Sequence, residues 1–268
     1  NLVDIVGTGG DGANLFNVST AASFVVAAGG GSVAKHGNRS VSSSSGSADV
    51  LEAAGVSLDL SPDEVTECVE KTGIGFMFAP MHHNAMRHAI GPRKELRLRT
   101  IFNILGPMTN PAGVKRLLVG VFDGSLCRPV AEVLDRLGAT HVMVVHSADG
   151  LDEISAAAST RVVEAKNGEI SEYEVTPEAL GMETVSLDDL EVSDALESLG
   201  LIREALSGAP GDRAHRARVV IALNAGAALY VAGLEPTVKD GVAKAMHLLQ
   251  SGTPWARVEA LADLTAGM

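Results

Sequence analysis

The stretch Gly7-Thr8-Gly9-Gly10-Asp11-Gly12 decides the fold, and it lies between two apolar segments. Residues 2–6 read Leu-Val-Asp-Ile-Val and predict a buried strand. Residues 21–28 are apolar and predict a helix, for which Ser19 or Thr20 is the expected N-cap. A glycine turn between a strand and a helix lets the backbone approach a ligand and points free N–H groups at negative charge. The pattern predicts a phosphate-binding turn, and the alternative is a tight turn without a ligand.

A second polar turn follows the next predicted strand, residues 32–34. Lys35-His36-Gly37-Asn38-Arg39 comes directly after it, and the serine-rich run 40–47 leads into a predicted helix at 48–54. Hydroxyl and backbone N–H groups in this position can form a second anion-binding turn, to which Lys35 and Arg39 would add positive charge. Two such turns indicate a ligand with two phosphate-bearing ends. The alternative interpretation of the serine run is a flexible linker.

Asp152 and Glu153 follow a strand predicted over 141–146, which is apolar enough for a parallel sheet that is buried on both faces. Acidic residues just past the end of such a strand are well placed to face a ligand. Carboxylate oxygens suit Mg²⁺, and the alternative is a pair of solvated loop acids. The histidines are weaker candidates for metal ligands than this acidic pair. His83 and His88 are five residues apart, so they would not lie on the same face of a helix.

The rest of the chain alternates between strand and helix patterns, which predicts an α/β fold with a mostly parallel central sheet flanked by helices. Asn167-Gly168 predicts the turn of a β-hairpin over 160–176. Residues 81–98 predict a helix that Pro92 breaks or kinks, and residues 102–111 predict a rigid apolar loop that walls a pocket. The further strands are expected at 74–79 and 117–122, and the further helices at 62–72, 129–137, 193–207, 214–232, 235–249 and 254–264.

Composition limits the class of protein. The net charge of −12 over 268 residues argues against a nucleic-acid partner, because a duplex-binding protein usually carries a basic face. Two cysteines outside any ligand pair favour a reduced, cytoplasmic protein. No apolar run in these residues is long enough to span a membrane, and we expect no signal peptide. Because residue 1 is Asn and a strand starts at once, we expect upstream residues to belong to the natural protein.

Taken together, these motifs resemble the anthranilate phosphoribosyltransferase family of tryptophan biosynthesis, over essentially the whole chain. The resemblance rests on Gly7–Asp11, Asn17–Thr20, Lys35–Asn38, Gly106-Pro107 and Asp152-Glu153. It implies transfer of the 5-phosphoribosyl group from phosphoribosyl pyrophosphate to the amine of anthranilate, with release of pyrophosphate. It also implies a large α/β domain at 1–79 and 105–268, and a small helical domain of which 80–104 is the remnant and the N-terminal part is missing. Family members are commonly homodimers through that helical domain.

The resemblance also assigns site residues. Phosphoribosyl pyrophosphate would be bound by Gly7, Gly10, Asp11, Asn17, Ser19, Thr20, Lys35, Asn38, Ser42, Ser43 and Ser47. Anthranilate would be contacted by Gly7, Asn38, His83, Arg93, Gly106 and Pro107, and two Mg²⁺ ions would be held by Ser19, Asp152 and Glu153. An aromatic amine is a neutral nucleophile at pH 7, so no dedicated catalytic base is expected. His83-Asn84 stands where the family often has His-Pro, a change that we expect to be tolerated.

Three other interpretations stay open. A pyrimidine nucleoside phosphorylase has a similar fold, but its Lys-His-Ser motif does not precede Gly7 here. A non-catalytic relative that binds nucleic acid fits poorly with the net charge of −12 and the Asp152-Glu153 pair. A dinucleotide-binding oxidoreductase would need Gly-x-Gly-x-x-Gly with a downstream acid, which also fits poorly.

Overall fold

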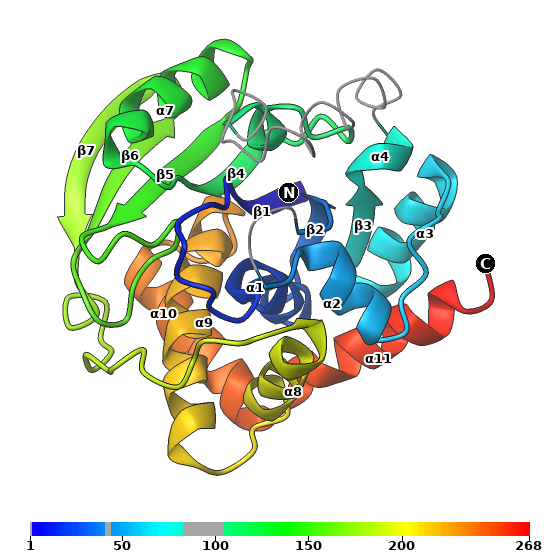
Figure 1. The fold of residues 1–268 in the computed structure, drawn as a ribbon. Coiled ribbons are helices and arrows are strands. Elements are labelled where there is room, and N and C mark those ends of the chain that lie inside the picture. The colour runs from blue at the N-terminus through cyan, green and yellow to red at the C-terminus, as the bar shows by residue number, and fades with distance from the viewer. Residues whose placement is uncertain (1, 41–43, 83–103) are drawn as a thin grey trace.

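The structure, a computed structural model, describes residues 2–40, 44–82 and 104–268. Its centre is a seven-stranded sheet with the strand order β3-β2-β1-β4-β5-β6-β7 (Figure 1). The first five strands in the chain pair in parallel, and β6 and β7 are added through antiparallel pairings, so the predicted mostly parallel sheet is confirmed. The strands are β1 (Leu2–Gly7), β2 (Ser32–Gly37), β3 (Ile74–Phe78), β4 (Arg116–Gly120), β5 (His141–Ser147), β6 (Thr160–Lys166) and β7 (Glu169–Val175).

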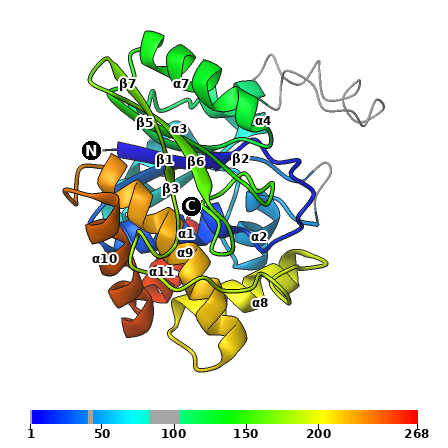
Figure 2. The same ribbon diagram turned by 90° about the vertical axis from the view of Figure 1, so that its left-hand side faces the viewer.

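Helices cover both faces of the sheet. Figure 2 shows α7 on one side and α1, α8, α9, α10 and α11 on the other. The α-helices are α1 (Val18–Ala28), α2 (Ser47–Ala53), α3 (Pro62–Thr72), α4 (Ala79–His82), α7 (Cys127–Arg136), α8 (Ala195–Leu206), α9 (Asp212–Val231), α10 (Val238–Ser251) and α11 (Thr253–Thr265). The short 3-10 helices are η2 (Gly106–Met108) and η3 (Gly124–Leu126).

Local sequence signals account for several of these elements. Ser61 accepts a hydrogen bond from the Glu64 N–H and completes a capping box for α3, which ends at Gly73 in the left-handed conformation. In the β6–β7 hairpin, Asn167 and Gly168 have φ angles of 53° and 83°, as the predicted turn requires. The expected helix and the expected hairpin are both confirmed.

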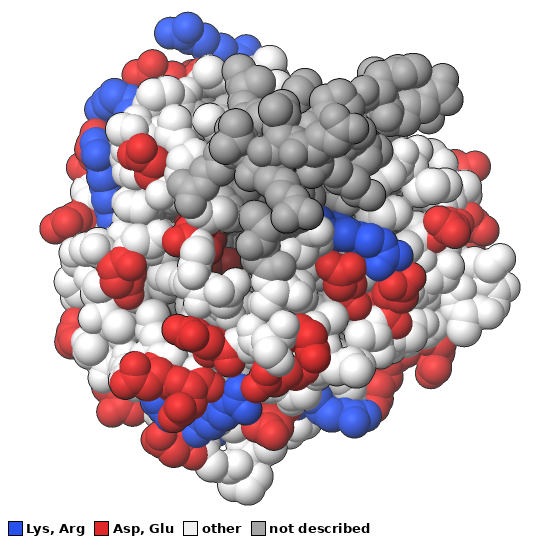
Figure 3. Space-filling model, viewed as in Figure 1, with Lys and Arg blue, Asp and Glu red and all other residues white. Residues whose placement is uncertain are grey.

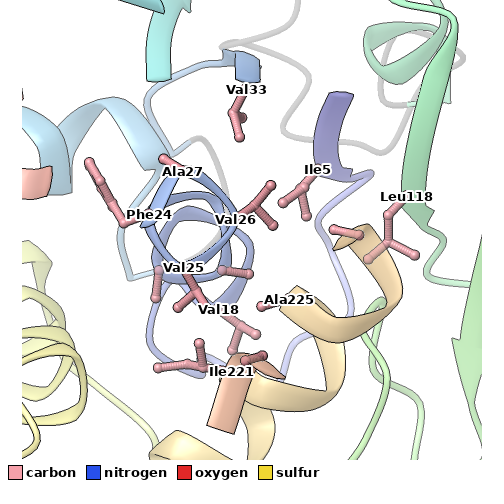
Figure 4. Close-up of a cluster of buried hydrophobic side chains, with 14 of the residues drawn as sticks. Ile5, Val18, Phe24, Val25, Val26, Ala27, Val33, Leu118, Ile221 and Ala225 are labelled. Atoms are coloured by element: carbon pink, nitrogen blue, oxygen red, sulfur yellow. The ribbon is translucent and has the colours of Figure 1, made fainter. Parts of the chain in front are cut away.

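Helix α1 lies in the middle of the core. Figure 4 shows Val26 of α1 beside Ile5 of β1, and Val18 and Val25 of α1 beside Ile221 of α9. Helices α9 and α10 approach very closely, because a Cβ atom on Gly241 would lie 2.2 Å from the Gly226 carbonyl oxygen. Small residues therefore bring the helical layers together, which explains how a chain with 3% aromatic residues fills its core.

The direction of strand addition reverses at β1. The chain adds β2 and β3 on one side of β1, and then places β4 and all later strands on the other side. In parallel α/β sheets, the crevice outside the carboxyl ends of two such strands is where ligands bind. Gly7 and Gly120 end β1 and β4 and are directly paired, so the glycine turn opens into this crevice.

Two expected boundaries are wrong. Strand β2 continues to Gly37, because its register with β3 runs unbroken from Val33 to Gly37. Lys35 and His36 are therefore buried strand residues and do not belong to a turn. Helix α1 begins at Val18 with Asn17 as its N-cap, so the expectation that Ser19 or Thr20 is the cap is also wrong.

Of the helices that the structure describes, none is long and apolar enough to cross a membrane. The predicted helix over 81–98 falls mostly on residues 83–103, outside the described ranges. The division into an α/β domain and a helical remnant at 80–104 accordingly stays a prediction.

We predict that Gly120→Ala destabilises the fold by about 3 kcal/mol or more, the upper part of the range for overpacking. A Cβ atom at this position would lie 1.5 Å from the carbonyl oxygen of Asp152. Gly200→Ala in α8 is the matched control, because a Cβ there meets no atom within 4 Å and alanine favours a helix. Urea denaturation of both variants checks the difference, and equal stability would contradict the close approach.

Candidate active site

The glycine turn and the loop after β5 are built around one another. The Gly9 N–H donates to Oδ2 of Asp152 at 2.7 Å, and the Thr8 N–H donates to the Gly120 carbonyl at 2.9 Å. A Cβ atom on Gly7 would lie 2.5 Å from the same Asp152 oxygen. Because glycine ends both strands, the acidic loop can lie directly over the carboxyl ends of β1 and β4.

The N-terminus of α1 is open to a ligand. Asn17 occupies the N-cap position, but its side chain makes no capping hydrogen bond. The Ser19 N–H in the first turn donates to the Glu153 carboxylate. The Thr20 hydroxyl is 1% exposed and has no hydrogen-bond partner among the described residues. The N-terminus of a helix attracts anions, so this end of α1 suits a phosphate.

The carboxyl groups of Asp11, Asp152 and Glu153 lie close together near the N-terminus of α1. Burial and the neighbouring Asp11 raise the pKa of Asp152 to about 7, although the Gly9 hydrogen bond opposes the shift. Burial and the neighbouring Asp152 raise the pKa of Glu153 well above its usual value, against the attraction of Lys35. The crowding is unfavourable for the charged carboxylates, and a divalent cation would relieve it.

The donor set fits Mg²⁺. Asp152 and Glu153 offer carboxylate oxygens, and Ser19 lies beside Glu153. In the part of the chain that the structure describes, no group of three His, Cys, Asp or Glu residues could hold a metal by itself. Mg²⁺ is usually bound by one or two carboxylates together with substrate phosphates, so a site that the substrate completes is the expected form.

Lys35 reaches the site from the strand beneath it. Its Nζ donates to the Ile5 carbonyl at 2.6 Å and to the Ser19 hydroxyl at 3.2 Å. Burial lowers the pKa of Lys35, although Asp4 and Glu153 attract its positive charge. Burial in turn raises the pKa of Asp4 to about 6, against that attraction. The cation is thereby fixed below Ser19 by neighbours on β1 and α1.

The second predicted turn meets the first at Asn17. The Asn17 Nδ2 donates to the Ser45 carbonyl at 3.3 Å, and the Ser45 hydroxyl donates to Asn17 Oδ1 at 2.7 Å. Asn38 is exposed directly after β2, and its carbonyl accepts from the Ala48 N–H at 3.3 Å. Ser47 begins α2, with its hydroxyl 2.1 Å from where a Cβ atom on Gly37 would lie. Of the expected phosphate ligands, Ser42 and Ser43 lie outside the described residues.

Arg39 does not supply this turn with free positive charge, contrary to the sequence-based expectation. Its guanidinium pairs with Glu52 at 2.7 Å and with Asp49 at 3.1 Å, and both acids belong to α2. These carboxylates compensate the arginine charge.

The loop that contains Gly106 and Pro107 is held against the sheet by Asn110. The Asn110 Nδ2 donates to Asp4 Oδ2 at 2.7 Å and to the Ala34 carbonyl at 2.9 Å. Pro107, Met108 and Asn110 line a cavity of about 90 Å³, and whether residues 102–111 wall a substrate pocket stays a prediction. The cavity is also lined by Gly113, Val114 and Lys115, which directly precede β4. The expected anthranilate residues His83 and Arg93 lie outside the described residues.

Sequence patterns alone missed several residues that position the site. Asn224 of α9 clamps Ile154, the residue after Glu153: its Oδ1 accepts from the Ile154 N–H at 2.9 Å, and its Nδ2 donates to the Ile154 carbonyl at 3.0 Å. Asp149 accepts from the hydroxyls of Ser147 and Ser155 in the same loop. Two sequence signals could have indicated such residues: the single amide Asn224 within an apolar helix, and the single acid Asp4 within an apolar strand.

Charged side chains are mixed on the face that Figure 3 shows. Acidic side chains are scattered over the described part of this face, and the basic ones lie in separate places, several of them beside acids. This surface is unlike the continuous basic face of a nucleic-acid-binding protein.

An α/β sheet with a glycine turn at its switch point and an acidic pair beside it is the arrangement expected of an enzyme that acts on phosphorylated substrates. The chain matches the model of the glycosyl transferase family, a/b domain, over residues 1–255. It is 64% identical over 264 residues to anthranilate phosphoribosyltransferase of Marinobacter nauticus, and 63% identical over 265 residues to that of Teredinibacter turnerae. These alignments cover 98% and 99% of the chain, and 77% and 78% of the relatives. The chain belongs to the anthranilate phosphoribosyltransferase family.

Solved structures agree with this assignment. The fold is similar to anthranilate phosphoribosyltransferase from Thermus thermophilus, with a TM-score of 0.91 and 45% identity over 99% of this chain and 78% of that one. It is also similar to the Saccharomyces cerevisiae enzyme in complex with phosphoribosyl pyrophosphate and Mg. That comparison has a TM-score of 0.88 and 28% identity, and it covers 100% of this chain and 74% of the yeast chain.

We predict that Asp152→Asn is more stable than the wild type at pH 8 without Mg²⁺. Because the pKa of Asp152 rises from 3.8 to about 7 on folding, folding disfavours its ionised form. The free energy of unfolding should therefore fall as the pH rises through this window, and the variant should lose the part of that dependence that Asp152 contributes, while Glu153 and Asp4 keep theirs. Thermal melts from pH 4 to 8 check it, with the exposed Asp59→Asn as control. Identical pH profiles for Asp152→Asn and the wild type would contradict the assigned pKa shift.

Proposed function

We propose that the crevice at the carboxyl ends of β1 and β4 is the active site of this chain. As a member of its family, the chain transfers the 5-phosphoribosyl group from phosphoribosyl pyrophosphate to the amine of anthranilate, a step of tryptophan biosynthesis. The observation that carries the placement is the N-terminus of α1, which lacks a side-chain cap, beside the buried Asp152 and the half-buried Glu153. Open donors and metal-ligating acids are both needed where a pyrophosphate group leaves.

Phosphoribosyl pyrophosphate would occupy the two joined turns. Its proposed ligands are those assigned by resemblance: Gly7, Gly10, Asp11, Asn17, Ser19, Thr20, Lys35, Asn38, Ser42, Ser43 and Ser47. The Thr20 hydroxyl supports this placement, because a buried hydroxyl that lacks a partner among the described residues gains one from a phosphate oxygen. The buried Lys35 adds a positive charge that phosphate would stabilise.

Ser19, Asp152 and Glu153 would hold Mg²⁺, with two ions proposed. A yeast relative was solved with phosphoribosyl pyrophosphate and Mg, which supports magnesium as the metal. The bound metal would neutralise negative charge on the departing pyrophosphate. The crowded carboxyl groups fit this role, since burial and the neighbouring carboxylates raise the pKa values of Asp152 and Glu153, and a bound cation would favour their charged forms.

The chain contributes orientation and charge stabilisation to the reaction. A bond forms between the anthranilate nitrogen and C1 of the ribose, the bond from C1 to the pyrophosphate oxygen breaks, and the nitrogen loses a proton. Backbone N–H groups of the glycine turn and of α1 stabilise the charge that develops on the leaving oxygen. A donor of this kind lowers the barrier by about 2–4 kcal/mol.

Asn38, His83, Arg93 and the Gly106-Pro107 turn, with Gly7, would contact anthranilate. A yeast relative was solved in complex with 4-fluoroanthranilate, which supports an aromatic acceptor. Arg93 would pair with the anthranilate carboxylate and orient the amine toward C1. We further propose a cytoplasmic homodimer that assembles through the small helical domain.

We predict that the wild-type chain depletes anthranilate only when phosphoribosyl pyrophosphate and Mg²⁺ are both present. Loss of anthranilate fluorescence measures the reaction, and omission of each component is the control. The double variant Asp152→Asn, Glu153→Gln should lose at least about a hundredfold in turnover, the scale of one lost electrostatic stabiliser. Asp59→Asn should match the wild type. Full activity of the double variant at low Mg²⁺ would refute the metal assignment.

We predict that Arg93→Ala mainly raises KM for anthranilate, by about tenfold or more, because a charge-assisted hydrogen bond to the carboxylate is lost. KM for phosphoribosyl pyrophosphate should stay within about twofold of the wild type. Lys94→Ala, which removes the neighbouring cation, is the matched control. An unchanged anthranilate KM would exclude this role for Arg93.

A further inference from the structure

Ser198 of α8 is a fully buried hydroxyl whose hydrogen bonds run to Asn17, in front of α1. The Asn17 N–H donates to the Ser198 hydroxyl oxygen at 3.0 Å, and the Ser198 hydroxyl donates to Asn17 Oδ1 at 2.8 Å. The two residues are 181 positions apart in the chain, so only tertiary packing brings them together. The side chain is 0% exposed on a helix that packs against α1, α2 and α9.

These bonds fix which way the Asn17 amide faces. Oδ1 accepts from two hydroxyls, those of Ser45 and Ser198, and Nδ2 donates to the Ser45 carbonyl. A flipped amide would place its oxygen against that carbonyl and lose both hydroxyl donors. One of the two Nδ2 hydrogens is used in this way, and the second has no acceptor among the described residues.

The same bonds explain why the N-cap residue of α1 does not cap. Asparagine is among the best capping residues, yet the Asn17 side chain makes no bond to the first turn of α1. Its oxygen is occupied by the two serine hydroxyls instead. In the first turn of α1, the Val18 N–H donates to the Phe16 carbonyl at 2.7 Å and the Ser19 N–H donates to Glu153, so neither is taken by the Asn17 side chain.

The backbone around this contact is also tied together. The Phe16 N–H donates to the Leu190 carbonyl at 3.3 Å, and the Val192 N–H donates to the Asn14 carbonyl at 2.9 Å. This short antiparallel pairing precedes α1 on one side and α8 on the other. Asp194 caps α8 by accepting from the Glu197 N–H at 2.9 Å, which sets Ser198 in the first turns of the helix.

We propose that Ser198 is a positioning residue for the phosphoribosyl pyrophosphate site. It holds the Asn17 amide with one Nδ2 hydrogen free for a phosphate oxygen, and it keeps the N-terminus of α1 uncapped. The proposal rests on the proposed function, since Asn17 must face the bound substrate. Ser198 itself touches no reacting atom.

The test compares Ser198→Ala with Ser207→Ala, an exposed serine just after the same helix. Titration calorimetry with phosphoribosyl pyrophosphate and Mg²⁺ gives Kd, and steady-state rates give KM for each substrate. Loss of the orienting bond should raise Kd and KM for phosphoribosyl pyrophosphate about tenfold, the upper range for one hydrogen bond. KM for anthranilate should stay within about twofold of the wild type, and Ser207→Ala should match the wild type throughout.

Ser198→Thr keeps the hydroxyl and should recover most of the affinity. Circular dichroism establishes that each variant is folded, and Ser198→Cys, which keeps the side-chain shape but is only a weak hydrogen-bond donor, carries the test if Ser198→Ala does not fold. A folded Ala or Cys variant with wild-type Kd overturns the inference, as does an equal rise in KM for both substrates. A wild-type chain that binds no phosphoribosyl pyrophosphate would instead overturn the proposed function.

Discussion

The site depends on one close approach, that of the loop after β5 to the carboxyl ends of β1 and β4. Gly7 and Gly120 are paired at this edge, and a Cβ atom on either would overlap Asp152. Once the loop lies there, Asp152 accepts from the Gly9 N–H and Glu153 accepts from the Ser19 N–H. The glycine turn, the start of α1 and the acidic pair therefore lie next to one another because Gly7 and Gly120 have no side chains.

Polar groups around the site hold the glycine turn, the start of α1 and the acidic pair in place, but they do not neutralise the crowded carboxylates. Asn224 clamps the backbone of Ile154, and Asp149 gathers two serine hydroxyls within the same loop. Ser198 and Ser45 fix the Asn17 amide on the other side of the crevice. Burial and the neighbouring Asp11 nevertheless raise the pKa of Asp152, so the site disfavours its own charged carboxylates. A metal ion would stabilise these carboxylates, and a polyanionic substrate that binds with it would complete the coordination of the metal.

Sequence patterns predicted much of the fold and part of the site. The alternation of strands and helices predicted the α/β class, and the turns at Asn167-Gly168 and at Ser61 formed as expected because their signals are local. The errors came from non-local contacts. Pairing with β3 extended β2 through Lys35 and turned a supposed loop cation into a buried one. The charge of Arg39 was compensated by acids of α2, which motif spacing cannot reveal.

The sequence by itself determined the fold class, the glycine turn, the acidic pair and the family to which these motifs belong. It could do so because periodicity, turn chemistry and motif spacing are properties of neighbouring residues. Only the tertiary structure decided that the N-cap of α1 does not cap, that Lys35 lies beneath Ser19, and that Ser198 and Asn224 support the site. Those relations join residues far apart in the chain, and they exist only once the strand order and helix packing have brought these residues together.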